Sequence, residues 1–561
     1  MTSAYSLGQR RTAALAEVDN AKYTWFHFRV CAVAGIGFFT DAYDIFSIGI
    51  ASTMLGYVYG RCDHTTVDPT VSSLTTTQDL ALKVATPIGT VIGQIMFGWL
   101  ADKFGRRKMY GIELMIIIFA TIAQVVLPRG SFNIIGALTA FRFIMGIGIG
   151  GGYPLSAVMS SEFASTAIRG RMMTSVFSCQ GWGSLASAIV AFVLTNAFKN
   201  SILNSIQNSD SSSAIPSIDV MWRLLIGLGV IPGCFALYFR LTIPESPRFT
   251  MDIQGNIRQA SRDIKSIFGG TEYIPVSEDD EETIQRLDIP TASWEDLRSY
   301  FGQLKNFKVL FGAAYSWFAL DIAFYCLNLN MPIILQAISF GRPNSYDDSK
   351  SSCSGLTEGV FHSLLSSCFG NLIVSAAALV PGYWVSFLLI DSWGRKPIQL
   401  MGFIMLTILF MIMGFAYDSL RGTLKAKAAF AFLYCLANFF QNFGPNTTTF
   451  LIPGEIFPTR YRSTAYGICA ASGKLGAVVA QIGFNRIQVN QAIKNDPTTS
   501  TENGAIESVK KILQLIAFFM LSGVLSTLLL PETKGQSLED LSNEEEQTSY
   551  ELLPTHTEAG S

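Results

Sequence analysis

Five charged side chains stand inside long apolar stretches of this sequence: Asp41, Asp44, Arg142, Asp321 and Lys474. A charge within a bilayer-spanning helix costs about 3 kcal/mol, so such residues usually face a polar cavity and serve a function there. The alternative interpretation is a structural ion pair or a helix-end cap. That alternative is stronger for Asp41 and Arg142, which could lie near a membrane interface.

One of these charges belongs to a regular pattern. Trp317, Asp321 and Tyr325 are four residues apart, so they share one face of a helix. A carboxyl group between an indole and a phenol indicates the wall of a polar cavity, since an apolar core stripe would not place a carboxyl at its centre. The glycine-rich run 146–152 permits close helix approach or local unwinding. Neutral hydrogen-bonding side chains stand in other apolar runs: Tyr153, Gln180 and Asn446.

These residue types together predict a site for a small oxyanion. One lysine with amide, phenol and indole donors can satisfy the oxygens of such an anion. Carboxylates beside it would repel a multiply charged anion unless they were protonated, which predicts uptake of an anion together with protons. Asp321 would bind its proton first, because the neutral carboxyl and the anion each lower the cost of the other. The sequence shows no nucleophile–base pair and no metal-ligand spacing, so we expect neither an enzyme nor a metal or cofactor site.

Composition indicates which elements position these residues. The 561 residues are 49% hydrophobic and 15% charged, with a net charge of -2, whereas soluble proteins carry about 25% charged residues. These values exclude a disordered chain and a basic nucleic-acid-binding protein, and they indicate a lipid environment. About twelve runs are long enough to cross a bilayer: 28–57, 83–101, 109–128, 133–160, 172–197, 221–241, 308–339, 361–390, 398–417, 426–453, 463–488 and 511–530.

The two halves of the chain repeat the same motifs. A loop with Asp, Gly and Arg follows both the second and the eighth apolar run. After the fourth run and again after the tenth run, a Glu stands seven residues before an Arg. A Pro-Glu pair ends both the sixth and the twelfth run. This duplication predicts two six-helix bundles, a common construction in transporters. The residues that we expect in gates and short loops are Gly98, Asp102, Gly105, Arg106, Arg107, Glu162, Arg169, Asp391, Gly394, Arg395, Glu455 and Arg462.

We therefore expect an all-α membrane protein with twelve transmembrane helices in two six-helix bundles. Lys and Arg residues concentrate in the short loops of one side, which predicts that this side, with both termini, is cytoplasmic. Only Cys62 and Cys353 of the nine cysteines lie in polar loops, and the sequence leaves their pairing open. The predicted divisions are a cytoplasmic N-terminal segment (1–27), a first bundle (28–244), an acidic cytoplasmic loop (245–306), a second bundle (307–531) and an acidic cytoplasmic tail (532–561).

At the level of longer motifs, the chain resembles the fungal proton-coupled inorganic phosphate transporters of the major facilitator superfamily, among them the yeast high-affinity phosphate permeases. The duplicated loops are typical of the superfamily, and the resemblance to the family covers nearly all of the chain. It rests on the motifs GFFTDAYDIF (37–46), YPLSA (153–157), LTIPESPR (241–248), SWFALDIAFY (316–325), PGYWVS (381–386), NFGPNTTTF (442–450) and PTRYRSTAYGICAASGKLGA (458–477).

The resemblance implies an importer of inorganic phosphate and protons at the plasma membrane that works by alternating access. It implies proton coupling through Asp44 and Asp321, and Asp41 in the same run as Asp44 is a further candidate. This chain departs from the family motif GGDYP at one position. Gly152 stands where the family has the helix-four aspartate that is implicated in proton transfer. The implied substrate contacts are Tyr153, Gln180, Trp317, Asp321, Tyr325, Asn446 and Lys474.

Two other functions stay open from the sequence. The cargo could be a glycerophosphodiester or another organic phosphate, with Gly152 making room for it, and competition against labelled phosphate would reveal such a preference. The chain could instead be a phosphate receptor that transports poorly and signals through its acidic loop or tail. Binding without flux in proteoliposomes would favour the receptor.

Overall fold

The computed structural model is helical, and the part of the chain that it describes contains no strand. Cys62 and Cys353 lie outside that part, as does most of the acidic loop between the predicted bundles. The described residues are 18–60, 74–129, 133–207, 214–253, 259, 262, 294–331, 334, 358–420, 422–494 and 501–542.

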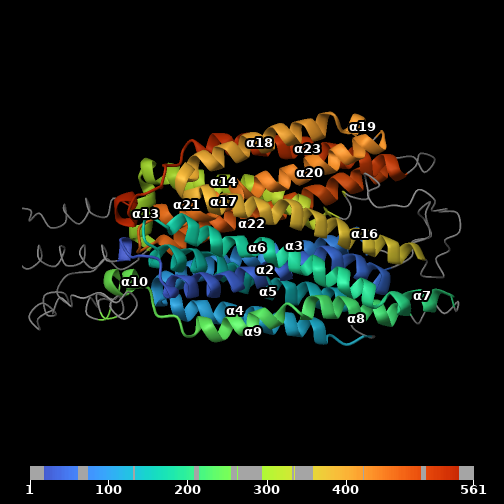
Figure 1. Ribbon diagram of the computed structural model, residues 1–561, viewed down its shortest axis with the longest axis horizontal. Coiled ribbons are helices and arrows are strands. Elements are labelled where there is room, and N and C mark those ends of the chain that lie inside the picture. Colours follow the sequence, from blue (N-terminus) through green and yellow to red (C-terminus); the bar gives the residue numbers. More distant parts are fainter. Residues whose placement is uncertain are drawn as a thin grey trace, which may run out of the picture.

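The first half of the chain supplies six crossings of a long bundle (Figure 1). The sixth crossing combines two helices that are separated by a turn at 228–229, and it forms one apolar stretch, Ile215–Arg240. The short helices α7 (Lys199–Gln207) and α10 (Pro247–Asp252) lie at opposite ends of the bundle. The crossing helices are α2 (Trp25–Tyr59), α3 (Thr76–Phe104), α4 (Arg106–Val126), α5 (Ile134–Phe163), α6 (Arg169–Ala197), α8 (Ala214–Gly227) and α9 (Val230–Arg240).

The second half repeats this arrangement above the first half in Figure 1. One of its crossings contains a π-helical turn, η3 (Ser375–Leu379), between α16 (Glu358–Val374) and α17 (Val380–Trp393). The other long helices are α14 (Leu304–Leu329), α18 (Arg395–Phe415), α20 (Leu424–Asn442), α21 (Pro445–Ile456), α22 (Arg462–Lys494) and α23 (Thr501–Thr527). Three short helices complete the half: α13 (Trp294–Gly302), α19 (Tyr417–Leu420) and α24 (Leu538–Ser542).

The predicted run 426–453 is not one continuous helix. It divides at Phe443 and Gly444 into α20 and α21, because Pro445 lacks the N–H that would continue the helix and its ring clashes with the preceding turn. Eleven other helices of the described residues are long and apolar enough to cross a membrane. With α20 and α21 as one crossing, the structure has the twelve-helix arrangement that the sequence predicts.

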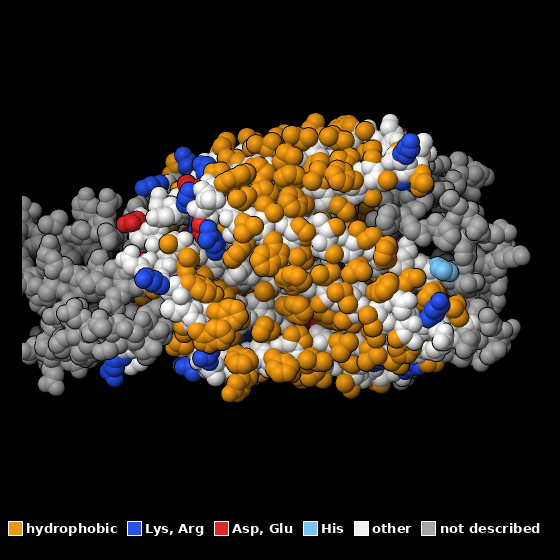
Figure 2. Space-filling model, in the orientation of Figure 1, with side chains coloured by type: hydrophobic (Ala, Val, Ile, Leu, Met, Phe, Trp, Pro, Cys, Tyr) orange, Lys and Arg blue, Asp and Glu red, His pale blue; other side chains and the backbone are white. Residues whose placement is uncertain are grey.

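The outer surface of the bundle suits a bilayer. Figure 2 shows hydrophobic side chains in a broad band across the middle, with most of the visible Lys and Arg side chains toward the end that carries α10 and α13. Large apolar side chains on this surface are exposed, such as Phe119, Phe235 and Phe518. Exposed phenylalanines without charged neighbours are favourable only where lipid replaces water, so the band marks the membrane-facing zone.

The two halves meet mainly along two seams. Helix α22 of the second half packs on α3 and α5 of the first, and α6 of the first packs on α16, α17 and α21 of the second. Each half is held together by contacts among its own helices, and the side chains on these inward faces lie between the two halves. This junction is therefore where a site can open and close without unfolding either half.

Glycines on α5 serve close helix approach. A Cβ atom at Gly146 would lie 2.3 Å from the carbonyl oxygen of Thr86, and one at Gly150 would lie 2.6 Å from that of Thr90, both on α3. Helix α5 continues without a break through Pro154. Of the two roles that the sequence allows for this run, the structure shows close packing and not local unwinding.

Candidate substrate site and its gates

A buried ion pair lies at the junction of the halves. Lys474 on α22 donates a hydrogen bond from Nζ to Oδ2 of Asp321 on α14 at 2.8 Å, and both side chains are nearly inaccessible to solvent. Both residues belong to the second half, and the ammonium group faces the first. Its Nζ atom lies 4.8 Å from the ring centre of Tyr153 on α5 and 4.7 Å from that of Tyr325 on α14.

Aromatic rings enclose this ion pair. The Trp317 ring lies 6.4 Å from that of Tyr153, and a Cβ atom at Gly473 would touch both the Trp317 ring and the Asp321 carboxylate. Helix α14 thus presents Trp317, Asp321 and Tyr325 on one inward face, as their spacing predicts. The cluster offers an ammonium group, phenol hydroxyls and an indole, which are the donors that the oxyanion hypothesis requires.

A second polar group adjoins the cluster through a tyrosine that the sequence analysis did not select. Asn446 on α21 donates to the hydroxyl of Tyr383 on α17 at 2.8 Å and to Oδ1 of Asn442 at 2.7 Å. The Tyr383 ring would touch a Cβ atom at Gly181, beside Gln180 on α6, and the Gln180 Oε1 atom is buried without a hydrogen bond. Tyr383 stands in the quoted motif PGYWVS, but without a charge or a periodic pattern it carried no signal of its own.

Asp41 lies next to Gly152. A Cβ atom at Gly152 would be 3.0 Å from Asp41 Oδ2 and 3.7 Å from both carboxylate oxygens of Glu113 on α4. Glu113 is buried against Arg240 in an ion pair. The sequence analysis missed Glu113 and Arg240, although each is a charge in or at the end of an apolar run.

Asp44 faces a different group of side chains, one helical turn farther along α2. It accepts a hydrogen bond from Thr121 at 3.4 Å and lies within the electrostatic reach of Arg142. One carboxylate oxygen of Asp44 and the Nη1 atom of Arg142 are buried without a hydrogen bond. Of the two helix-one carboxylates, Asp41 is therefore the one that lies beside Gly152, the residue before Tyr153.

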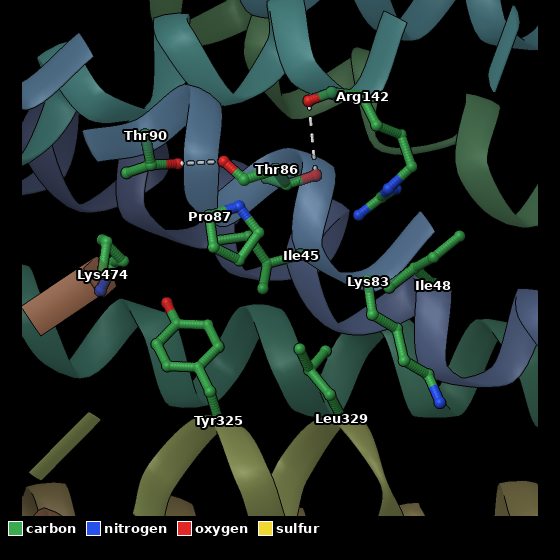
Figure 3. Close-up of a pocket in the computed structure, with 10 residues that line it drawn as sticks. All are labelled: Ile45, Ile48, Lys83, Thr86, Pro87, Thr90, Arg142, Tyr325, Leu329 and Lys474. Atoms are coloured by element: carbon green, nitrogen blue, oxygen red, sulfur yellow. Dashed lines mark hydrogen bonds between the residues drawn. The ribbon is translucent and has the colours of Figure 1, made fainter. Parts of the chain in front are cut away.

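A small cavity begins at Lys474 and Tyr325 and continues between the halves (Figure 3). It has about 10 Å³ of space for the centre of a water molecule, which is room for about one water. A phosphate ion does not fit without movement of the walls. The cavity is lined by Ile45, Ile48, Lys83, Thr86, Pro87, Thr90, Arg142, Tyr325, Leu329 and Lys474.

Each half has a charged network at one end of the bundle, which we call the motif end: the end of Asp102, Arg106, Glu162, Asp391 and Arg395. In the first half, Arg106 pairs with Asp102 at 3.3 Å and with Glu162 at 3.5 Å. In the second half, Arg395 pairs with Asp391 at 3.1 Å and with Glu455 at 2.9 Å. The two networks use equivalent residues of the repeated motifs, as the duplication predicts.

A glutamate stabilises the start of the helix after each loop. Glu245 accepts the backbone N–H groups of Arg106 and Arg107 at the start of α4, and Glu532 accepts those of Arg395 and Lys396 at the start of α18. Burial raises the pKa of Glu245, and these N–H donors and the Arg106 charge oppose the rise. The loop glycines Gly105 and Gly394 have φ near +100° (102° and 101°), which glycine adopts without strain.

The networks also join the two halves. Arg462 of the second half pairs with Glu162 at 3.0 Å, and Asp102 accepts the backbone N–H of Thr464 at 2.7 Å. A Cβ atom at Gly98 would lie 2.6 Å from the carbonyl oxygen of Ser463, so the first turn of α22 rests directly on α3.

Arg169 departs from the symmetry of the repeated motifs. Its counterpart Arg462 pairs with Glu162, but Arg169 pairs with Asp19 at 3.3 Å and donates to the backbone oxygen of Gln536 at 3.0 Å. Arg169 thus joins the segment before α2 to the segment after α23. Arg171 of the same loop donates its backbone N–H to Asp391 at 3.1 Å.

The other end of the bundle, the far end, is joined by hydrogen bonds to neutral acceptors. Lys83 donates to Oδ1 of Asn330 at 3.2 Å, and Asn485 donates to the backbone oxygen of Thr76 at 3.1 Å. Together with the cross-half contacts at the motif end, these bonds close the central site on both sides. The structure is therefore an occluded arrangement.

Comparisons with known proteins identify the family. The model described as Sugar (and other) transporter matches residues 30–322 and 360–544. A repressible high-affinity phosphate permease of Neurospora crassa is 45% identical over 550 residues, covering 96% of this chain and 90% of the relative. An inorganic phosphate transporter of Saccharomyces cerevisiae is 42% identical over 550 residues, covering 95% and 87%.

The chain belongs to the family of inorganic phosphate permeases. The fold is that of the major facilitator superfamily, since a proton:xylose symporter of that superfamily matches with a TM-score of 0.64 at 21% identity, covering 92% of this chain and 98% of the symporter. A partially occluded inward-open structure of the xylose transporter from E. coli matches with a TM-score of 0.61 at 18% identity. These proteins are transporters, and the permease is not an enzyme.

In the permease, an aromatic layer separates the central ion pair from the motif end. Phe177 on α6 stacks on Phe450 on α21 with ring centres 4.3 Å apart, and Phe38 on α2 contacts the Phe450 ring edge-on at 5.2 Å. Phe38 also contacts Tyr153 at 5.0 Å, so the layer lies directly against the site. Because Phe450 belongs to the other half, the layer must separate when the motif end opens.

Glu162 should hold the motif end closed. Glu162→Gln removes the charge that Arg462 of the other half requires, and losing one partner of a buried ion pair shifts the equilibrium strongly toward the open arrangement. We expect maleimide labelling of a Ser463→Cys reporter, buried in the closed form, to become roughly tenfold faster or more.

The matched control for this labelling experiment is Glu455→Gln. Its partner Arg395 lies in its own half, so labelling should change much less. Labelling of the native cysteines is subtracted with the parent chain. Equal acceleration in both variants would contradict a specific role of the Glu162–Arg462 contact in closure.

Proposed function

We propose that the permease imports inorganic phosphate with protons by alternating access, with Lys474 as the main charge that binds the anion. The observation that carries this proposal is the Lys474–Asp321 ion pair, buried between aromatic donors at the junction of the halves. The phosphate cargo is supported by the names of relatives that are 45% and 42% identical. Tyr153, Gln180, Trp317, Tyr325 and Asn446 supply further hydrogen bonds.

Charge balance explains why a proton accompanies the anion. Without substrate, the Lys474 ammonium and the Asp321 carboxylate neutralise each other in a site that is closed to water. A monovalent phosphate beside an ionised Asp321 would leave a net negative charge there, which is costly in a low dielectric. If Asp321 takes up one proton, Lys474 pairs with the phosphate and the site stays neutral. The protonated carboxyl then donates a hydrogen bond to the anion and no longer repels it.

The orientation follows from the distribution of positive charge. Lys and Arg side chains gather at the motif end (Figure 2). Lys103 at the end of α3 and Arg106 and Arg107 at the start of α4 belong to this end. By the positive-inside rule this end faces the cytoplasm, and the described segments next to both termini lie at it. We propose the plasma membrane as the location, with bundles at 28–244 and 307–531 joined by a cytoplasmic loop at 245–306.

The space beside Gly152 favours a small cargo. A Cβ atom there would already meet Asp41 at 3.0 Å, so the missing side chain does not create a pocket for an organic group. The cavity beside Lys474 has room for about one water, so a glycerol substituent would require more movement of its walls than inorganic phosphate alone. Inorganic phosphate therefore fits this site better than a glycerophosphodiester.

The test is uptake of labelled phosphate into proteoliposomes with and without an imposed pH gradient. We expect the gradient to drive accumulation by the parent chain. Lys474→Gln should weaken phosphate binding roughly 30-fold or more, because the anion loses its buried charge partner. Lys510→Gln removes a lysine from a surface pair with Asp418 and serves as the matched control. Parent-like binding by Lys474→Gln would remove Lys474 from the substrate site.

Asp321→Asn tests the proton step. Asparagine imitates the neutral carboxyl in shape but cannot release a proton, so phosphate should still bind, with a flattened pH dependence. Accumulation driven by the pH gradient should fail, whereas phosphate exchange between equal concentrations should persist. If the variant concentrated phosphate as well as the parent, the proton would have to travel through Asp41 or Asp44.

Gly152→Asp tests the departure from the family motif. The new carboxyl would lie against Asp41, and two carboxylates in contact cannot both ionise readily, so proton binding near Tyr153 should increase. We expect a steeper rise of uptake with external acidity than in the parent, at matched expression. Gly152→Asn fills the same space without a titrating group and controls for packing. A Gly152→Asp profile that overlays the parent's would exclude this position from coupling.

A further inference from the structure

The far side of the cavity is built from polar groups that the central site does not use. Lys83, Thr86 and Thr90 on α3 follow one another at helical spacing and line the cavity together with Arg142 on α5. Figure 3 shows Arg142 and Lys83 on the side of the cavity away from Lys474, with the guanidinium extending toward the space between Thr86 and Lys83. All four residues belong to the first half, whereas Lys474 and Tyr325 belong to the second.

The charges of this lining are of one sign. Three of the ten lining side chains are cations, namely Lys83, Arg142 and Lys474, and none is a carboxylate. Each cation has its carboxylate neighbour outside the lining: Asp79 for Lys83, Asp44 for Arg142 and Asp321 for Lys474. The cationic partner of each pair is the one that lines the cavity, so an anion that enters it meets the positive end of the pair first.

One strong donor in the lining is free to bind a ligand. Arg142 is 1% exposed, and its Nε atom donates to the backbone oxygen of Leu82 at 3.3 Å. Its Nη1 atom is buried without a hydrogen bond. A buried guanidinium N–H without a partner costs free energy, and an oxyanion is the ligand that best satisfies it.

We propose that Lys83 and Arg142, in the part of the cavity that Thr86 and Thr90 also line, form a second, outer anion site that holds phosphate before it reaches Lys474. The identity of the anion rests on the proposed function. Lys83 bonds to Asn330 of the other half, so opening of the far end takes this acceptor away and leaves the ammonium group for the arriving anion. Binding there replaces part of the water shell of the anion before it enters the aromatic site.

The outer site predicts an effect on one side of the membrane. Lys83→Gln keeps a donor for Asn330 but removes the charge. The KM for uptake by intact cells should rise roughly tenfold, the lower end of the factor by which charged clefts concentrate substrate. Lys83→Arg should stay close to the parent. In inside-out vesicles, where phosphate arrives from the motif end, the KM of Lys83→Gln should equal that of the parent.

Two controls separate charge from closure. Asn330→Ala removes the cross-half hydrogen bond and keeps the Lys83 charge, so its KM in cells should stay within about twofold of the parent, the usual effect of one neutral hydrogen bond. Lys510→Gln controls for loss of a far-end lysine. The proposal is overturned if Lys83→Gln leaves the KM unchanged or raises it equally in intact cells and in inside-out vesicles. It is also overturned if Asn330→Ala raises the KM in cells as much as Lys83→Gln does.

A binding measurement tests the outer site without transport. Purified Lys474→Gln lacks the central charge, so any remaining weak binding of labelled phosphate reports the outer site, and adding Lys83→Gln should abolish it. Identical binding by the single and the double variant would contradict the outer site. If the parent chain bound phosphate but never accumulated it, the proposed function would be contradicted. The comparison of binding by the single and the double variant would still test the outer site.

Discussion

The requirement that buried charges be neutralised governs this structure. Lys474 and Asp321 are nearly inaccessible to solvent, and the same is true of Arg240 with Glu113 and of Arg395 with Glu455. Isolated, each of these charges would cost several kcal/mol or more, so each is held against a partner. A transporter can exploit this requirement, because any ligand that takes one partner away must supply an equivalent charge or a proton. The Lys474–Asp321 pair is the one that faces the cavity, and there the exchange can take place.

The two ends of the bundle meet this requirement differently. At the motif end, the halves are joined by full charges, with Glu162 placed between Arg106 and Arg462. At the far end, the cross-half bonds among the described residues involve amides, backbone oxygens and a hydroxyl–thiol contact between Thr195 and Cys368, with Lys83 as a charged donor. Amide contacts exchange with water at little cost, whereas separating buried ions is expensive. Opening of the motif end therefore requires more free energy than opening of the far end. In the proposed mechanism, neutralisation of the central site by substrate and proton favours that opening.

Sequence reasoning reached the fold and much of the site because both depend on patterns that lipid enforces. Apolar runs, the duplicated loops and the spacing of Trp317, Asp321 and Tyr325 each have a direct physical cause. The break at Gly444 was missed because hydropathy does not register a proline between two apolar stretches. Tyr383 and Glu113 were missed for another reason, since their importance arises from neighbours that are distant in sequence, Asn446 and Arg240. Such partners are established only when the helices pack.

At Gly152 the chain lacks the aspartate of the family motif, but a carboxyl group from another helix lies close to the same place. The family pattern places an aspartate on helix four beside Tyr153, and this permease has only a backbone there. The Asp41 carboxylate of the neighbouring helix α2 lies 3.0 Å from where a side chain at 152 would begin. A carboxyl group therefore stays beside position 152, although it comes from α2 and shares the region with Glu113 and Arg240. In the proposed mechanism the coupled proton is assigned to Asp321, because that carboxylate is the partner of Lys474.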